Sequence, residues 1–386
     1  MTAFELDDEQ KELATHAREV ARAQLIDVEA EGTEGRVNRR LLEALGDTGL
    51  LPRIFPRSAG GAGAAEVSAV ELCLLRESLA QESTAVETAL ALQGLGGYPI
   101  LQGGTPEVVG RWIPRVARGR AVAAFALSEP EAGSDAGALE LRAEAVDGGY
   151  RLTGTKTWIS NAPDADVYAV FARTGGQGPR GVSAFAVAGD SPGLSGTHLE
   201  LLSPHPVGRL ELDGVFVARD CLLGVPDEGF RVAMRTLDLF RPSVGAFAVG
   251  MAQAALDASV AHAQTRRAFD RPLRDFQAIS HRIAEMAMRT DAARLLVLRA
   301  AAGYDAGRKV TREAAMAKLF ATETAQWVVD GAVQIHGAHA LERGHLLEHL
   351  YREVRAPRIY EGTSEVQREI IARDIFKAAA GRAQER

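Results

Sequence analysis

The chain begins with a long stretch in which apolar residues recur every three or four positions. Between Asp8 and about Arg118, residues such as Leu13, Ala17 and Val20 follow this spacing, which is that of one face of a helix. Proline and glycine interrupt the pattern at intervals and divide it into segments. The first part of the chain is therefore predicted to be a unit of several helices.

From about Ala121 to Val225 the apolar residues come instead in short runs separated by polar turns. Such runs are typical of strands, and Asp147-Gly148-Gly149 has the composition of a hairpin turn between two of them. The pattern predicts a small antiparallel sheet or barrel. The predicted strands are 122–127, 141–146, 150–159, 167–172, 182–187 and 210–217.

Long helical patterns return from Gly229 onward. The predicted helices 229–267, 275–302 and 311–336 have lengths suited to a helical bundle. Helices, then strands, then helices, without alternation of single strands and helices, indicate an α+β fold. We predict three domains, which are residues 1–120, residues 121–227 and residues 228–386.

Composition and charge argue against nucleic-acid binding and indicate the cellular compartment. The 386 residues carry 44 basic and 51 acidic side chains, a net charge of −7, and the basic residues are scattered. This distribution lacks the positive surface of a nucleic-acid-binding protein, so no nucleic acid is expected as a partner. Two cysteines fit a reducing compartment, and the acidic start lacks the features of a secretory signal, so we expect a cytoplasmic protein.

Two further patterns are assigned no function. The most apolar segment, 244–256, is too short to span a bilayer, so we predict a buried helix and no membrane association. Gly176-Gln177-Gly178-Pro179-Arg180-Gly181 matches the G-x-G-x-x-G pattern, but a strand-like run follows it. That fingerprint requires a helix whose N-terminus receives the pyrophosphate. We interpret the glycines as a loop between two strands.

Two segments of the middle part combine small, polar and aromatic residues at strand ends. Residues 125–135 leave a strand and enter a loop whose hydroxyl and backbone N–H groups would suit a polar ring or a phosphate. On composition alone, a plain strand-to-loop turn explains this segment at least as well. Residues 156–161 end another strand with Trp158 beside a hydroxyl, where an indole covers an aromatic cofactor or packs in the core.

A carboxylate stands just before the last helical pattern. Ser364 and Gln367 form a predicted capping box, so the helix is predicted to begin there, with Glu361 on the preceding loop. A glutamate close to a helix N-terminus, beside an aromatic residue and a glycine, is placed to be flexible and electrostatically tuned. The alternative is a solvated loop carboxylate, the usual environment of glutamate.

Four segments, taken together and in order, resemble the acyl-CoA dehydrogenase family along essentially the whole chain. The resemblance implies an N-terminal α-helical domain, a middle antiparallel β-barrel and a C-terminal four-helix bundle. It also implies bound FAD and a homotetramer with FAD at subunit contacts. The segments are Leu127-Ser-Glu-Pro-Glu-Ala-Gly-Ser-Asp135, Gly154-Thr-Lys-Thr-Trp-Ile-Ser-Asn161, Arg266-Arg-Ala-Phe-Asp-Arg-Pro-Leu-Arg-Asp-Phe-Gln277 and Ile359-Tyr-Glu-Gly-Thr-Ser-Glu-Val-Gln-Arg368.

The resemblance also implies roles for individual residues. Positions that line the flavin ring are Phe125, Leu127, Ser128, Trp158 and Ser160. Positions near the flavin phosphates and the pantetheine arm are Gly133 and Ser134. Positions that reach the dinucleotide are Arg266, Phe269 and Gln277, with Gln334 and Gly337 reaching the FAD of a neighbouring subunit. Thr363 and Glu365 match the flavin-contacting positions that follow the catalytic loop. Positions expected to bind the acyl-CoA substrate are Ser134, Asp238, Arg241, Thr88, Tyr360 and Gly362.

The implied reaction is the oxidation of an acyl-CoA to its trans-2-enoyl-CoA. Glu361 would remove the α-proton while the β-hydrogen leaves as a hydride to N5 of FAD, and the electrons would pass to an electron-transfer flavoprotein. The thioester carbonyl would accept from a ribityl hydroxyl and from the N–H of Glu361, which stabilises the developing enolate. Some members carry the base on another helix, but the matching residue here is Phe240, which cannot accept a proton.

Two other functions remain open on the same fold. One is a flavin-dependent acyl-CoA oxidase, and the other is a degenerate member that binds flavin or acyl-CoA without dehydrogenation. Departures from the family pattern at Asp270, Ala338 and residues 203–208 bear on FAD affinity. The acyl pocket is expected to be apolar, because residues 88–93, which match its wall, contain no ionic side chain.

Overall fold

The computed structural model describes residues 5–384, with side chains up to residue 380, and the chain divides into two compact units. The C-terminal unit comprises the residues up to Glu19, Ala69–Thr84 and the residues from Asp238 onward. The sheet unit comprises Val20–Ser68 and Ala85–Leu237. Each unit combines segments that are distant in sequence, and the predicted domain boundaries at residues 120 and 227 stay predictions.

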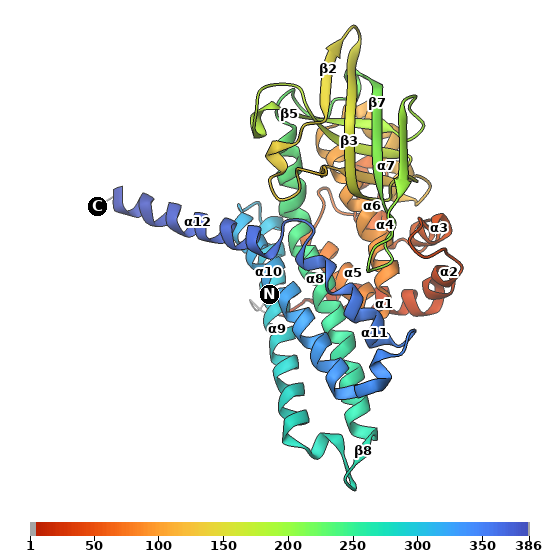
Figure 1. Ribbon diagram of the computed structural model, residues 1–386, viewed down its shortest axis with the longest axis vertical. Coiled ribbons are helices and arrows are strands. Elements are labelled where there is room, and N and C mark those ends of the chain that lie inside the picture. Colours follow the sequence, from red (N-terminus) through yellow and green to blue (C-terminus); the bar gives the residue numbers. More distant parts are fainter. Residues whose placement is uncertain (1–4, 385–386) are drawn as a thin grey trace. The chain divides into compact units, whose positions relative to one another are not determined.

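The sheet unit contains several of the helices that precede the sheet in the sequence (Figure 1). The last of them, α7, begins at Pro106 directly after Thr105, whose hydroxyl accepts from the N–H of Val108 at 3.3 Å. A capping hydroxyl followed by proline is a strong helix start. The hydroxyl accepts from a free N–H of the first turn, and proline has no N–H that would need a partner there. The helices are α2 (Ile26–Ala30), α3 (Arg39–Asp47), α4 (Leu50–Arg53), α6 (Thr84–Gly103) and α7 (Pro106–Ala117).

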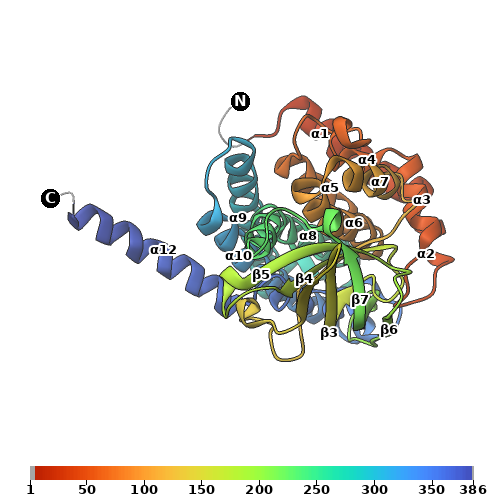
Figure 2. The ribbon, with the colours of Figure 1, turned by 90° about the horizontal axis from the view of Figure 1, so that it is seen from above.

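Seven strands form one curved sheet in the order β1-β4-β2-β3-β7-β6, and β5 pairs with β4. Figure 2 shows β4, β3, β7 and β6 following one another across the sheet. Most pairs are antiparallel, including the β2–β3 hairpin predicted at Gly148. The strands are β1 (Ala123–Ala126), β2 (Arg142–Val146), β3 (Gly149–Ser160), β4 (Val167–Arg173), β5 (Val182–Ala188), β6 (Leu194–His198) and β7 (Val207–Ala218).

The α+β fold class is confirmed, with two corrections to the predicted sheet. First, β1 pairs with β4 in parallel, and β2 touches β4 in parallel at Arg142 and Arg173, so the sheet is not purely antiparallel. Second, β6 was not predicted. The sequence of β6 is Leu-Ser-Gly-Thr-His and none of its residues is fully buried, so it pairs along β7 through its backbone without an apolar run.

The C-terminal unit is built from long helices packed side by side (Figure 1). Gly245 lies on α8 where an added Cβ would be 2.7 Å from Val297 of α9 and 3.2 Å from the Ala317 carbonyl of α10. Only glycine allows these three helices to approach so closely. The helices are α1 (Asp8–Val20), α5 (Ala69–Glu82), α8 (Gly229–Thr265), α9 (Gln277–Asp305), α10 (Thr311–His336), α11 (Leu346–Glu353) and α12 (Ser364–Gln384).

Two helices of this unit stand out, α8 by its length and apolar composition and α12 by its exposed apolar residues. Among the described residues, α8 alone is long and apolar enough to cross a membrane by length and composition, and 72% of its apolar window is buried inside the structure. The helix has 37 residues and extends beyond the apolar segment 244–256 at both ends, so length does not exclude a membrane span, contrary to the prediction. The predicted buried helix is confirmed. The first turns of α12 pack on α10, and the helix then extends away from it with Phe376 74% exposed (Figures 1 and 2).

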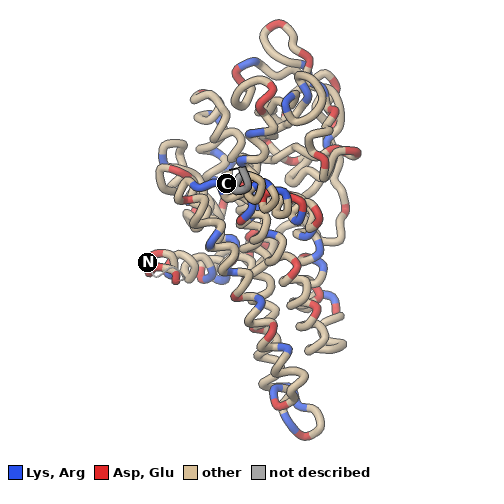
Figure 3. Tube along the Cα trace, turned by 90° about the vertical axis from the view of Figure 1, so that its left-hand side faces the viewer, with Lys and Arg blue, Asp and Glu red and all other residues tan. Residues whose placement is uncertain are grey.

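Charges of both signs are interspersed along the described chain, as Figure 3 shows. The distribution agrees with the scattered basic residues noted in the sequence. The Gly176–Gly181 segment leads directly into β5, so the interpretation of these glycines as an inter-strand loop is confirmed.

Candidate active site

The polypeptide that leaves β1 carries three predicted flavin residues. The ring of Phe125 lies 4.9 Å from that of Phe171 on β4. The next two residues are bonded to β3, because the Leu127 carbonyl accepts from Lys156 Nζ at 2.9 Å and the Ser128 carbonyl accepts from the Thr157 N–H at 3.1 Å. The two segments that the sequence singled out separately are thus joined side by side.

A buried ion pair strengthens this junction. Lys156 Nζ lies 2.8 Å from Glu129 Oε1, and both side chains are buried. The Glu129 carboxylate also accepts from the N–H groups of Glu140 and Leu141, at 2.6 and 3.0 Å. Burial lowers the pKa of Lys156 to about 8, while the charge of Glu129 acts in the opposite direction. The pair therefore fixes the segment that precedes the glycine-containing loop.

Trp158 presents its indole at the surface of the sheet unit. The pairing of β3 with β7 shifts register between Lys156 and Ile159, and within this irregularity Trp158 has a φ of 55°. Bulges of this kind redirect side chains, and the tryptophan is 53% exposed. An exposed indole offers a flat apolar surface that suits the flavin ring. Ser160, half-buried, follows at the end of the same strand.

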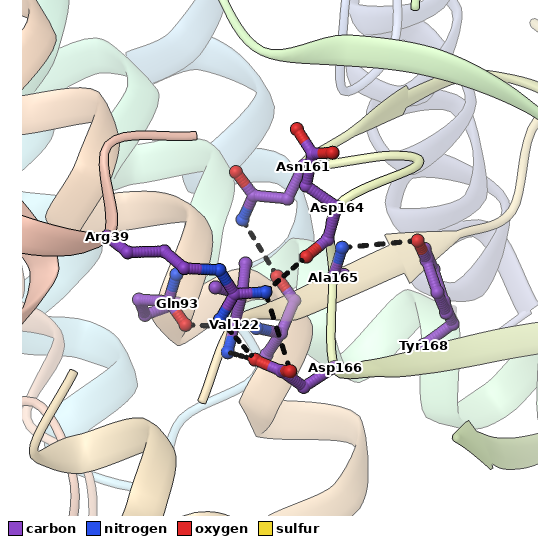
Figure 4. A network of polar contacts seen from close by, with 9 residues as sticks. Arg39, Gln93, Val122, Asn161, Asp164, Ala165, Asp166 and Tyr168 are labelled. Atoms are coloured by element: carbon purple, nitrogen blue, oxygen red, sulfur yellow. Dashed lines mark hydrogen bonds and ion pairs between the residues drawn. The ribbon is translucent and has the colours of Figure 1, made fainter. Parts of the chain in front are cut away.

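The polar network in Figure 4 fixes the ends of the strands that carry these residues. Asn161, with a φ of 64°, donates from Nδ2 to the Ala123 carbonyl at 2.8 Å. Gln93 Oε1 accepts from the Ala123 N–H at 3.0 Å, and Arg39 pairs with Asp166 at 2.8 Å. Gln93 belongs to the segment predicted to line the acyl chain, and it is fully buried against β1.

Three predicted ligand-contact residues lie elsewhere in the sheet unit. Gly133 and Ser134 lie on an exposed loop, and no atom stands within 4 Å of the position that a Cβ on Gly133 would take. The backbone there is open to an approaching phosphate. Thr88 is half-buried on α6, and its hydroxyl donates to Glu87 Oε2 at 3.3 Å. Glu87 is fully buried, so an acidic group directly precedes the segment predicted to lack ionic side chains.

Glu361 lies on a strained turn of the C-terminal unit. Its φ is 52° and that of Gly362 is 92°, and a positive φ is uncommon for a residue other than glycine. The carbonyl oxygens of both residues are held by side chains. The Glu361 carbonyl accepts from Arg241 Nε at 3.2 Å and Gln367 Nε2 at 3.1 Å. The Gly362 carbonyl accepts from Lys318 Nζ at 2.7 Å and from the same Gln367 amide at 3.0 Å.

The helix after this turn begins at Ser364 as predicted, but the predicted capping box is wrong. The Thr363 hydroxyl accepts from the Val366 N–H at 3.3 Å, so Thr363 provides the cap. The Ser364 hydroxyl donates to Glu323 at 2.6 Å, and Gln367 bonds the turn instead of the helix start. Thr363 is half-buried at the end of the turn, where the resemblance expects a flavin contact.

Arg241 extends from α8 to the same turn, and Asp238 lies beside it on α8 and accepts from the Thr311 hydroxyl at 3.1 Å. Arg241 is 5% exposed, and its Nη1 lies 3.8 Å from Asp238 Oδ1. Burial lowers the pKa of Arg241 and raises the pKa of Asp238. Phe240, which lies between these two residues in the sequence, is buried. This position therefore offers no carboxylate that could replace Glu361. Arg241, predicted to contact coenzyme A, therefore also belongs to the support of the turn.

The segment predicted to reach the dinucleotide forms a small hairpin of β8 (Arg267–Ala268) and β9 (Arg271–Pro272). Phe269 at its tip is 90% exposed with a φ of 48°, and Asp270 has a φ of 65°. Aspartate tolerates this conformation better than most residues other than glycine, so the departure from the family pattern at Asp270 is compatible with the turn.

The other predicted contacts of the C-terminal unit are also accessible. They lie at the two ends of the hairpin segment, at the end of α10 and around the Glu361 turn. The exposed residues are Arg266, Gln277, Gln334, Gly337, Tyr360 and Glu365.

The predicted cofactor residues fit FAD by their chemistry. Trp158 and Phe269 expose large aromatic surfaces, which soluble proteins usually cover. Gly133 leaves its backbone open, and Arg266 supplies an exposed cation suited to a phosphate. The sequence did not identify Glu129, Lys156, Lys318 or Gln367 as support residues.

Comparison with known proteins gives consistent matches. Family models describing the N-terminal, middle and C-terminal domains of acyl-CoA dehydrogenase match residues 7–120, 124–215 and 227–376. The chain is 35% identical to cyclohexane-1-carbonyl-CoA dehydrogenase of Geobacter metallireducens, over 98% of this chain and 100% of that protein. It is 36% identical to the caffeyl-CoA reductase-Etf complex subunit CarC of Acetobacterium woodii, over 89% and 91% respectively.

Solved structures agree with these matches. Butyryl-CoA dehydrogenase from Megasphaera elsdenii superimposes with a TM-score of 0.91 at 32% identity, covering 97% of this chain and 99% of that one. The FAD complex of PigA gives 0.91 at 27% identity, covering 96% and 98%. Fold and site thus define an FAD-dependent oxidoreductase. The chain belongs to the acyl-CoA dehydrogenase family.

Proposed function

We propose that this protein catalyses the FAD-dependent α,β-dehydrogenation of an acyl-CoA thioester to the trans-2-enoyl-CoA, with Glu361 as the base. The observation that carries the proposal is the Glu361 turn. A glutamate stands in a left-handed conformation. Its own carbonyl and that of Gly362 accept hydrogen bonds from Arg241, Lys318 and Gln367. Strain of this kind persists where the surroundings hold it and is concentrated at functional sites.

The chemistry requires a carboxylate held in a fixed position. The α-proton of a thioester is weakly acidic, and transfer to a positioned base contributes about two to four powers of ten in rate. Positioning the reacting groups contributes further, because misplacement by about 1 Å can cost about 100-fold. The bonded turn supplies such positioning for the Glu361 carboxylate. The other position at which family members carry the base is occupied here by Phe240, which cannot accept a proton, so the role falls to Glu361.

FAD, when bound, accepts the hydride that leaves the β-carbon. In this proposal Trp158 covers the flavin ring, Arg266 and Phe269 bind the dinucleotide, and Ser134 lies near the phosphates and the pantetheine arm. Their exposure supports these roles, because each is accessible to a ligand.

A homo-oligomer, expected to be a tetramer, belongs to the same proposal. Gln334 and Gly337 are exposed at the end of α10, where the resemblance expects the FAD of a neighbouring subunit. The extended part of α12 carries Ile375, 49% exposed, and Phe376, 74% exposed. Exposed apolar residues on one extended helix are typical of a surface that another chain covers.

The electron acceptor proposed is an electron-transfer flavoprotein, since one relative is named as a subunit of a reductase-Etf complex. That name also supports a second candidate, the reverse reduction of a 2-enoyl-CoA, and acryloyl-CoA reductase (NADH) of Anaerotignum propionicum is similar at 36% identity. Both directions would use the same residues.

Anaerobic titration of the purified flavoprotein tests the function. Saturated acyl-CoAs of different chain length and ring content should bleach the oxidised flavin, and the acid-released cofactor should be FAD. Reoxidation by added electron-transfer flavoprotein but slowly by air supports the dehydrogenase, whereas rapid reoxidation by air would indicate an oxidase. Reoxidation by enoyl-CoA with no bleaching by any saturated acyl-CoA would favour the reductase, and no flavin after reconstitution would refute all three.

A further inference from the structure

Lys318 is a buried cation in the first half of α10. None of its surface is exposed, and Nζ donates to the Gly362 carbonyl at 2.7 Å. Burying an ammonium group is costly unless it is paired and hydrogen-bonded, and apolar replacements of buried ionic groups are often neutral or stabilising. Stability alone therefore does not account for a lysine at this position.

The contact falls at the centre of the Glu361 turn. Gln367 already bonds the carbonyls of Glu361 and Gly362, and Arg241 bonds the Glu361 carbonyl from the opposite helix, α8. Lys318 adds a charge-assisted bond to Gly362, and such bonds are roughly twice as strong as neutral ones. Side chains from α8, α10 and α12 thus converge on two consecutive peptide units.

We propose that Lys318 is a positioning residue for the dehydrogenation, which holds the left-handed Glu361–Gly362 turn so that the Glu361 carboxylate keeps its working orientation. This inference rests on the proposed function, in which Glu361 is the base. Lys318 itself touches neither substrate nor cofactor in this scheme. It acts through the Gly362 carbonyl and through its attraction to the Glu361 carboxylate.

The charged groups around Lys318 define how its protonation matters. Glu361 on the turn, Glu323 on α10 and Glu365 on α12 attract its charge, and Arg241 on α8 repels it. Burial outweighs these interactions and lowers the pKa of Lys318 to about 8. Below this pH the ammonium group bonds Gly362. Above it, the neutral amine donates more weakly and no longer attracts Glu361, so the turn loosens as the pH rises.

Lys318→Met tests the proposal, because methionine fills a similar volume without a donor or a charge. The Gly362 carbonyl keeps the Gln367 amide as a donor, so the variant is expected to fold. Lys318→Gln, which keeps a neutral donor, is measured in the same way and stands in if Lys318→Met does not fold. Lys11→Met, which removes an exposed lysine of α1, is the matched control.

Each variant is compared with the parent for FAD content, acyl-CoA affinity and the anaerobic rate of flavin reduction from about pH 6.5 to 9.5. Exchange of the acyl-CoA α-hydrogen with solvent deuterium, followed by NMR, reports on the base separately from hydride transfer. We expect FAD content and affinity near parental values, with reduction and exchange slowed about 10- to 100-fold in Lys318→Met, as for a misplaced catalytic group. The parent and Lys11→Met should lose rate above about pH 8, and this loss should be absent from Lys318→Met.

Reduction by Lys318→Met within about twofold of the parent, or an unchanged loss of rate above pH 8, would overturn the proposal. A Glu361→Gln variant distinguishes this failure from failure of the proposed function. If Glu361→Gln abolishes exchange while Lys318→Met behaves like the parent, only the role of Lys318 is wrong. If Glu361→Gln still exchanges and reduces at the parental rate, the base assignment is wrong, and the role of Lys318 is wrong with it.

Discussion

Replacement of Glu361 by glutamine isolates its proton-accepting function from its place in the fold. The bonds that hold the turn involve the carbonyl oxygens of Glu361 and Gly362, and a change of side chain leaves these acceptors in place. Glutamine has nearly the same volume and tolerates the same rotamers. The turn, FAD content and oligomeric state should therefore persist in Glu361→Gln.

The expected loss of rate follows from removal of the general base. Loss of a general base alone costs about two to four powers of ten in rate. No carboxylate is available at Phe240 to replace it, so flavin reduction by acyl-CoA should fall by at least about 100-fold. Stability should change less, by about 1 kcal/mol, the centre of the range for single substitutions. The direction is destabilising, because the negative charge that attracts the buried Lys318 is lost.

The assay is anaerobic stopped-flow reduction followed at the absorption of the oxidised flavin, with binding measured separately by a non-reacting CoA thioester. Glu369→Gln, which changes an exposed carboxylate of α12 outside the site, is the matched control and should reduce at a rate within about threefold of the parent. Bleaching of Glu361→Gln within about tenfold of the parental rate would refute the reasoning, because another group would then have to accept the proton.

Three further predictions concern the support of the site. Trp158→Ala should weaken FAD retention about two- to tenfold, the value of an aromatic contact, as measured by fluorescence of the released cofactor; unchanged retention would exclude the indole from the flavin site. Gly362→Ala places a Cβ 2.6 Å from Gln367 Nε2 at a φ of 92° and should cost about 1 to 3 kcal/mol, seen as a lower Tm, whereas an unchanged Tm would show that the turn is not strained. Glu129→Ala should cost about 3 to 5 kcal/mol in chemical denaturation because it leaves Lys156 buried without its anion, and a loss no larger than that of the exposed Glu131→Ala would contradict this account.

The long helices were predictable from sequence because their apolar residues recur with the helical period over many turns. Helix α10 has the predicted bounds of 311–336. Strand β6 was not, because a strand that pairs through its backbone without burying a face leaves no apolar pattern. The parallel pairing of β1 with β4 joins residues more than forty positions apart, and local patterns contain no information about that partner.

The candidate site divides in the same way. Glu361 and Trp158 were identified because they stand in motifs whose residue types suit the chemistry. Lys318 was not, because a lysine within a helical pattern indicates a solvated face, and only the packing of α8, α10 and α12 shows that it is buried. The cap was displaced by one residue for a related reason, since Thr363 and Ser364 are equally good caps in sequence and the acceptor Glu323 engages the serine.

The exposed indole of Trp158 also allows cofactor binding to be followed by intrinsic tryptophan fluorescence. Of the three tryptophans, Trp112 is 6% exposed and Trp327 is half-buried between Arg282 and Arg289, whereas Trp158 is 53% exposed. A water-exposed indole emits at longer wavelength and is the one reached by a soluble quencher such as acrylamide. The long-wavelength, quenchable part of the intrinsic emission should therefore come chiefly from Trp158. Binding of FAD to the apoprotein should then be measurable as a decrease in this part of the emission.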